Sequence, residues 1–242
     1  MNIVRIIRNY LKIMINTVWR KFTGNFIFPY EIITILNKNF SPHSNFSFVQ
    51  VGGNDGISND FIYDFVTARK SNGIVIEPVT EYFNTLTKNY KQFPSIKTVN
   101  MAVHATEKRV EIFKVKSESL QDLPSWASGI ASLNSEHHKA SGISSNHIHS
   151  VHSNADTLMN ILKDQNFLRP IDYLQIDVEG YDDQVIDQTD FDILKPKIIR
   201  FEYMNLSEGT TASIIKRLKS NGYFCYYDAV DVIAIQPKDI YL

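Results

Sequence analysis

The chain has 242 residues, of which 43% are hydrophobic and 21% are charged. This composition is that of an ordinary globular protein and excludes a largely disordered chain. The length suits one generous domain whose core needs no covalent support. Cys225 is the only cysteine, so an internal disulfide is excluded, and this fits a reducing compartment.

The formal net charge of −1 conceals an uneven distribution along the chain. Residues 1–30 contain five basic residues and no acidic residue, so the remaining chain carries a formal charge of −6. A mildly acidic body argues against a nucleic-acid-binding domain, which would carry a basic face on the body itself. The basic leader favours an anionic membrane surface or an acidic partner.

The first predicted element is an amphipathic helix within this leader. Its apolar side chains recur at helical spacing, at Ile3, Ile6, Ile7, Tyr10, Met14 and Val18. Basic residues and asparagines interrupt them, so the leader is neither a membrane span nor a signal peptide. The helix packs on the domain or on a second subunit, or it attaches to a membrane surface, and both readings stay open. We therefore separate an N-terminal segment, residues 1–45, from a domain over residues 46–242.

Strand and helix signals alternate along the rest of the chain. Apolar runs bounded by turn residues predict buried strands, at residues 46–51, 73–78, 96–103, 171–180 and 197–203. Helical spacing predicts helices between them, around residues 61–66, 82–86, 158–162 and 214–218. Alternation over residues 110–115 predicts an additional edge strand, and residues 223–236 predict a terminal hairpin.

This order predicts a doubly wound α/β domain with a mainly parallel sheet and helices on both faces. The hairpin adds an antiparallel strand at one edge of the sheet. Residues 117–152 are polar, rich in serine and histidine, and show no clear period. A stretch of that length without regular structure is usually a functional lid or a binding loop.

Candidate ligand-binding residues follow the ends of the first three strands, where ligands sit in a doubly wound sheet. Residues 50–56 form a glycine turn, which lets the backbone approach a ligand closely. Glu77 lies about 20 residues further on, where an acid suits the two hydroxyls of a ribose; a surface carboxylate before a proline turn is the alternative. Asn100 and Ala102, after the third strand, are placed to flank an adenine ring. Position 54 is Asn where a dinucleotide fingerprint that begins at Gly52 would have its second glycine, which disfavours an NAD-dependent oxidoreductase.

Five motifs together resemble the FkbM-type methyltransferases, a class I family that uses S-adenosylmethionine. They are VQVGGNDG, IEPV, VNMAV, the S-W-x-x-G-x-x-S segment of residues 125–132, and LQIDVEGYD. The resemblance covers residues 46–202. It implies a Rossmann-like class I methyltransferase fold with a seven-stranded sheet, and O-methylation of sugar or polyketide hydroxyls.

The resemblance also implies a cofactor site when it is carried over by position. Residues of the glycine turn would line the methionine and ribose part of the cofactor, namely Gln50, Gly52, Asn54, Asp55 and Gly56. Glu77, beside Pro78, would hold the ribose. Asn100 and Ala102 would lie near the adenine, and Ser132 would face the site.

One position departs from the family pattern. Many relatives end the first strand with an acid where this chain has Gln50. Glutamine still hydrogen-bonds the ammonium or carboxylate of the cofactor, but it supplies no charge.

Two acids at the end of the central strand are candidates for catalysis. A hydroxyl acceptor gains from a base that removes its proton as it attacks. If the strand extends to Glu179, Asp177 and Glu179 point to the same side and raise each other's pKa. We predict that Asp177 positions the cofactor or the acceptor and that Glu179 accepts the proton or binds the acceptor. The alternative is that Glu179 caps the next helix.

Histidines gather in the polar stretch, at positions 137, 138, 147, 149 and 152. Such a cluster supplies a base, binds a metal, or is simply solvated. It lacks the cysteines and the regular spacing of zinc motifs, so no metal site is predicted. His138 is the histidine that we include among the catalytic candidates.

These observations lead us to expect an S-adenosylmethionine-dependent O-methyltransferase. Its acceptor would be a hydroxyl of a small molecule or sugar, in cell-surface glycan biosynthesis. The alternative is a non-catalytic binding or scaffold protein with the same fold. We expect no nucleic-acid partner, because the body is acidic and the Asn/Asp-Pro-Pro-Tyr motif is absent. The expected location is cytoplasmic, with peripheral contact at the inner face of the membrane through the leader, and a homo-oligomer stays open.

Overall fold

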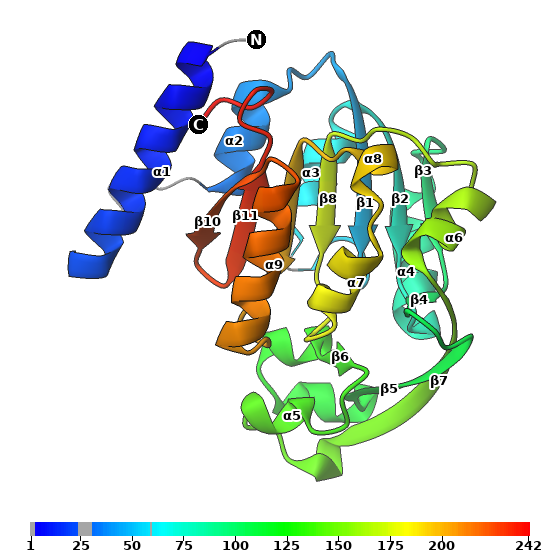
Figure 1. The fold of residues 1–242 in the computed structure, drawn as a ribbon. Coiled ribbons are helices and arrows are strands. Elements are labelled where there is room, and N and C mark those ends of the chain that lie inside the picture. The colour runs from blue at the N-terminus through cyan, green and yellow to red at the C-terminus, as the bar shows by residue number, and fades with distance from the viewer. Residues whose placement is uncertain (1–2, 24–30, 59) are drawn as a thin grey trace.

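The computed structural model describes residues 3–23, 31–58 and 60–242. Its centre is a seven-stranded sheet in the order β10–β11–β9–β8–β1–β2–β3 (Figure 1). In chain order the strands are β1 (Asn45–Val51), β2 (Lys70–Ile76), β3 (Ile96–Val99), β8 (Tyr173–Ile176), β9 (Ile198–Glu202), β10 (Phe224–Asp228) and β11 (Asp231–Ile235). Within this sheet, β11 runs in the direction opposite to the other six strands. The predicted Rossmann-like topology with a terminal hairpin is therefore confirmed.

The central strands are buried on both faces because their side chains alternate between two cores. In β1, Val49 and Val51 enter the core on one face, while Phe46 and Phe48 enter the core on the other. A strand covered on both sides needs apolar residues at successive positions. This is why the run at residues 46–51 shows no polar alternation.

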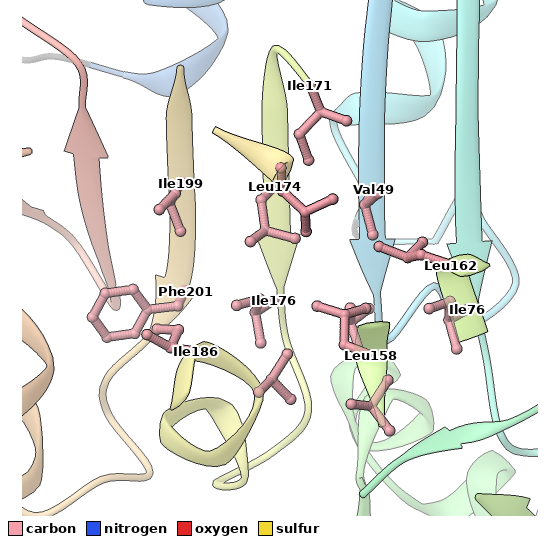
Figure 2. Packing of buried hydrophobic residues seen from close by; sticks show 14 of the residues in the cluster. Val49, Ile76, Leu158, Leu162, Ile171, Leu174, Ile176, Ile186, Ile199 and Phe201 are labelled. Carbon is pink, nitrogen blue, oxygen red and sulfur yellow. The ribbon is translucent and has the colours of Figure 1, made fainter. Parts of the chain in front are cut away.

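Helices cover both faces of the sheet, as predicted (Figure 1). One face carries α2 (Ile32–Asn39), α3 (Ile62–Thr67) and α4 (Thr80–Tyr90), and the other carries α6 (Leu158–Asp164), α7 (Asp182–Gln188) and α9 (Glu208–Ser220). A short helix, α8 (Phe191–Leu194), precedes β9. Figure 2 shows the core on the face covered by α6, α7 and α9, where Leu158, Leu162 and Ile186 pack over the strands.

A smaller, four-stranded sheet lies beyond the carboxyl ends of the parallel strands (Figure 1). It contains β4 (Ala102–Val103), β5 (Arg109–Val115), β6 (Ala131–Ser132) and β7 (Ile148–Asp156). The strand predicted over residues 110–115 is present, but the prediction that it is an edge strand is wrong, because β5 lies between β6 and β7 in this smaller sheet. The predicted strand over residues 96–103 is also divided. Asn100 lies at the break and donates hydrogen bonds from Nδ2 to the main-chain oxygens of Glu77 and Pro78, after which β4 pairs with β7.

The polar stretch is more regular than predicted. Residues 117–152 contain η1 (Ser117–Asp122), η2 (Ser125–Gly129), α5 (His137–Ala140), η3 (Ser145–His147) and the first half of β7. β7 escapes prediction because it is half-exposed and rich in polar residues, so its strand signal is weak. Its pairing with β5 along seven residue pairs, rather than its composition, makes it a strand.

The predicted N-terminal helix is α1 (Ile3–Thr23), which lies along the β10 edge of the main sheet (Figure 1). The residues that it buries are Asn9 and Asn16, whereas its apolar side chains are largely exposed. No helix in the described ranges combines the length and the apolar character needed to cross a bilayer. The boundary between residues 45 and 46 falls at the start of β1 and remains a prediction as a domain division.

Candidate active site

A cavity of about 410 Å³ opens at the carboxyl ends of β1, β2 and β8. This is the edge of a doubly wound sheet where ligands bind. The smaller sheet closes one side of the cavity with residues of β4, β5 and β6. Eight of the predicted site residues line it: Gln50, Gly52, Asn54, Glu77, Pro78, Ala102, Asp177 and Glu179.

Two segments of the main chain approach each other closely at the glycine turn, and this approach requires a glycine. Gly52 has a φ of +84°, and a Cβ built on it would lie 1.8 Å from the main-chain oxygen of Asp177. The amides of Gly52 and Gly53 both donate to the main-chain oxygen of Ile76 at 3.0 Å. The turn therefore joins the ends of β1, β2 and β8 into one wall of the cavity.

Glu77 is a buried carboxylate held by two main-chain amides. Its Oε2 accepts a hydrogen bond from the amide of Asn54 and its Oε1 accepts one from the amide of Val79, both at 2.8 Å. Only 4% of the residue is exposed, and burial raises the pKa of Glu77 to about 7 despite these two bonds. Such a shift corresponds to about 3 kcal/mol against the ionised form. A group that costs the fold this much is a candidate for function rather than for stability.

Gln50, which lines the same cavity, carries an acceptor atom that is unpaired among the described residues. Its Nε2 donates to Asp60 Oδ2 at 2.9 Å, while its Oε1 is buried and receives no hydrogen bond from any described residue. A buried acceptor without a partner costs about 1–3 kcal/mol. Because the side chain lines the cavity, a ligand that donates a hydrogen bond would satisfy it. Asp60 was not predicted, and burial raises its pKa.

The lining of the cavity is strongly acidic. Five carboxylates line it, namely those of Asp60, Glu77, Asp177, Glu179 and Glu202. No lysine, arginine or histidine within the described part of the chain belongs to the lining. Burial, followed by the charge of Glu179, raises the pKa of Asp177, although its side chain is open to the cavity. Burial and the charge of Asp177 likewise raise the pKa of Glu202 to about 7.

Glu179 reaches the cavity by a different backbone path from the one predicted. β8 ends at Ile176, and Glu179 has a φ of +52°, so the strand does not carry Asp177 and Glu179 to one side. The expectation of a continued strand is wrong. The Oε2 atom of Glu179 accepts hydrogen bonds from Asn205 Nδ2 at 3.1 Å and contacts His137 Nε2 at 2.8 Å. The N-cap of α7 is Tyr181, with no capping hydrogen bond from a side chain, so the alternative in which Glu179 caps this helix is wrong.

His137 rather than its neighbour His138 contacts the lining of the cavity. Its hydrogen bond to Glu179 raises the pKa of His137, against the opposing effect of burial. His138 Nδ1 instead lies 2.7 Å from the main-chain oxygen of Ile143, and the ring is buried away from the cavity. The structure therefore does not place the predicted catalytic histidine, His138, at the site. Within the described ranges, no group of three His, Cys, Asp or Glu side chains is arranged to hold a metal ion.

Four further predicted residues support the cavity from behind instead of lining it. Ser132 Oγ donates to the main-chain oxygen of Glu179 at 2.7 Å. Asp55 accepts hydrogen bonds from the amide and hydroxyl of Ser58, which holds the chain beyond the glycine turn. Asn100 holds the turn that follows Glu77, as described above. Gly56 completes the glycine turn at a φ of +82°.

Aromatic and apolar side chains that were not among the predicted site residues complete the cavity. They include Tyr82, Met101, Ile112, Trp126 and Tyr181. Trp126 is 49% exposed, and Tyr181 stacks on His104 with ring centroids 5.1 Å apart. Trp126 lies in the S-W-x-x-G-x-x-S segment and Tyr181 lies in LQIDVEGYD, so their positions within these motifs were the available signal.

Comparisons with known proteins show the family to which this chain belongs. The model of the methyltransferase FkbM domain matches residues 50–225, well over half of the chain. No curated protein matches this chain. Among solved structures, the methyltransferase domain of METTL16 is 11% identical, with a TM-score of 0.47, and the similarity covers 98% of this chain and 82% of that one. Fibrillarin from Aeropyrum pernix, in complex with natively bound S-adenosyl-L-methionine, is 9% identical over 84% and 72% of the two chains, with a TM-score of 0.42. At these identities the family rests on the family model alone.

Proposed function

Because the chain belongs to the FkbM methyltransferase family, we propose that it uses S-adenosylmethionine to methylate a hydroxyl of a small molecule or sugar. A sugar of a cell-surface glycan is the acceptor that we favour. The cofactor, when bound, supplies a methyl group on a positively charged sulfonium.

The acidic lining of the cavity carries this proposal. S-Adenosylmethionine has two cationic groups, the sulfonium and the ammonium, and carboxylates attract both in a cavity that is partly shielded from water. Nicotinamide dinucleotides carry phosphates, which the same lining would repel. The five lining carboxylates, with no basic residue among the described lining, therefore favour a sulfonium cofactor.

Two residues fit the polar groups of that cofactor. Glu77 already accepts two main-chain hydrogen bonds, but a carboxylate has about four acceptor positions, so it can also receive the two hydroxyls of a ribose. Gln50 Oε1 is an open acceptor for the ammonium. Met101, Ala102 and Val103 provide the adjoining apolar surface that suits an adenine ring.

Glu179 is the residue that we propose to accept the proton of the acceptor hydroxyl. It lines the cavity, and its contacts with His137 and Asn205 both use Oε2. None of the hydrogen bonds from described residues uses Oε1, which leaves this atom for the acceptor hydroxyl. Methyl transfer needs the acceptor oxygen aligned with the methyl group, so His137 and Asn205 contribute by fixing the carboxylate. Asp177, in the same lining, would position the cofactor or the acceptor.

The aromatic side of the cavity supports a sugar as the acceptor. Tyr82, Trp126 and Tyr181 belong to the lining, and Trp126 is 49% exposed. Aromatic rings offer large apolar surfaces with polar tips. Ligand sites of this kind combine apolar walls with a few placed polar groups. The apolar face of a sugar ring matches such a wall, while its hydroxyls reach Glu179.

Calorimetric titration of the full chain with S-adenosylmethionine and S-adenosylhomocysteine tests the cofactor. Micromolar affinity, about −8 kcal/mol, is the expected result. Glu77→Ala should weaken it by about 1.5–3 kcal/mol per lost hydrogen bond, that is, at least tenfold. Glu111→Ala is the matched control, because Glu111 is exposed on β5 outside the cavity lining.

Two outcomes decide between the functions. If the folded protein binds neither ligand, methyl transfer is excluded and a non-catalytic scaffold takes its place. If both bind and Glu77→Ala weakens them, labelled methyl transfer to a polysaccharide fraction tests the acceptor class. That transfer should be lost in Glu179→Gln while cofactor binding persists.

A further inference from the structure

Helix α1 docks on the domain through its polar side. Asn9 and Asn16 are almost fully buried, at 0% and 2% exposure. Asn9 Nδ2 donates to the main-chain oxygens of Ile240 at 2.6 Å and Pro237 at 3.3 Å. Its Oδ1 accepts a hydrogen bond from the amide of Leu242. The C-terminal segment therefore holds the polar side of the helix, which is the reverse of ordinary packing for an amphipathic helix.

The apolar side of α1 consequently points away from the protein. Ten of the sixteen exposed large hydrophobic side chains in the described chain belong to this helix. Six of them form a stripe that we call the outer face: Ile3, Ile7, Leu11, Met14, Val18 and Phe22. Their spacing of three or four residues places them along one side of the helix. A contiguous apolar surface of this kind marks an interaction site.

The charges beside the outer face are all positive. Helix α1 contains five basic residues and no acidic one. Arg5, Lys12 and Arg20 lie partly buried toward the domain, whereas Arg8 and Lys21 are exposed beside the outer face. Two copies of α1 packed face to face would bring like charges together. An anionic surface would instead be attracted to them.

We propose that the outer face of α1 is a docking surface for an anionic lipid bilayer, on which the helix lies in the plane of the interface. A helix with an apolar side, basic flanking residues and insufficient apolar length to span is the form that binds at such an interface. The apolar side chains enter the acyl boundary, and Arg8 and Lys21 contact lipid phosphates. No residue of α1 lines the cavity of the candidate active site, so the docked helix is not part of that site. The proposal does not depend on methyl transfer.

Vesicle flotation with the full chain tests this surface. The vesicles are either pure phosphatidylcholine or contain about one-third phosphatidylglycerol. We expect binding to the anionic vesicles at low salt and little binding to the neutral ones. Ile7→Ser with Val18→Ser should weaken binding at least tenfold, because each removes a large exposed apolar side chain. Arg8→Gln with Lys21→Gln should weaken it about 25-fold, since each basic residue near such a surface contributes about fivefold.

The matched control is Leu168→Ser with Ile193→Ser, which removes two exposed apolar side chains outside α1. It should bind vesicles as the wild type does. All the substituted side chains are exposed, so the fold should be intact in every variant. Thermal unfolding of each variant verifies this. The proposal is overturned by absent binding, by equal binding to both vesicles, or by equal loss in the control pair. It is also overturned if light scattering shows a dimer that Ile7→Ser with Val18→Ser dissociates, because a second copy then covers the outer face.

Discussion

His137 Nε2 lies 2.8 Å from Glu179 Oε2. The contact connects α5, within residues 117–152, to the turn that follows β8. This contact links the polar stretch, which carries most of the histidines, to the acidic lining of the cavity. Neither partner is in regular strand structure, and Glu179 occupies a left-handed conformation at a φ of +52°. Left-handed backbone at a non-glycine residue is uncommon and concentrates at functional sites. The contact therefore identifies Glu179 as the first residue to test.

Replacing Glu179 by glutamine should lower kcat by about 10²–10⁴-fold, the range for loss of a general base. Affinity for S-adenosylmethionine should change little, since the substitution is isosteric. Glu136→Gln is the control, because Glu136 is exposed in the same region and pairs with Lys139. Radiolabelled methyl transfer under saturating cofactor measures the effect. Unchanged turnover in Glu179→Gln would remove this residue from the mechanism.

His137 and His138 should differ sharply in their effect on turnover. His137→Gln keeps a donor near the position of Nε2 but loses the imidazole whose pKa the bond to Glu179 raises, so kcat should fall at least tenfold. His138→Asn keeps a donor near the position of Nδ1, which lies beside the main-chain oxygen of Ile143, so kcat should persist. Equal losses in the two variants, or a loss confined to His138→Asn, would contradict the assignment.

The same pair predicts a pH dependence. The bond to Glu179 raises the pKa of His137 above the usual 6.5, so the charged pair contributes fully to stability below that pH. The contribution is lost as the pH rises through the raised pKa. Urea unfolding from pH 6 to 9 should show a loss of stability in the wild type that His137→Gln does not share. Parallel curves for the two proteins would show that the pair contributes nothing measurable.

Cofactor affinity should depend on the ionisation of Glu77. Burial raises its pKa from 4.5 to about 7. The ionised form binds hydroxyl donors and cations, so affinity for S-adenosylmethionine should be about tenfold weaker at pH 6 than at pH 8. Folding stability changes with pH in the opposite direction to cofactor affinity. The contribution of Glu77 to the stability of the folded state is complete below pH 4.5 and declines as the pH rises through 7. Calorimetry at the two pH values measures the binding, and a pH dependence that survives in Glu77→Gln would assign it to another carboxylate such as Asp177.

Gly52→Ala should unfold the protein or destabilise it by at least about 3 kcal/mol. An added Cβ would overlap the main-chain oxygen of Asp177, which no side-chain rotation can relieve, and φ at this position is unfavourable for alanine. For a chain of this size such a loss lowers Tm by about 6–12 °C. Gly209→Ala is the control, since it lies in α9 with only Ser207 Oγ near the added atom, at 3.9 Å. Scanning calorimetry should show the control at or above the wild-type Tm.

The sequence was sufficient for the main sheet and for the residues at its carboxyl edge. Buried parallel strands need runs of apolar residues, and the connecting helices need apolar residues at helical spacing, so both leave direct local signals. Gly52 and Glu77 were found for the same reason, because they follow strands whose ends must meet in this topology. Residues 110–115 show the limit of local pattern: the strand exists, but its partners are β6 and β7, and pairing is a property of the fold.

The orientation of side chains was decided only by the tertiary structure. His137 and His138 are adjacent, and successive residues of a helix point about 100° apart, so the position of α5 in the fold determines which ring meets Glu179. Helix α1 is the second case. Its amphipathic pattern predicts a helix, but the burial of its polar side depends on Asn9 meeting the main-chain groups of a segment at the far end of the chain. Periodicity reports that a helix has two unlike sides, and only the contacts made in three dimensions determine which side the protein covers.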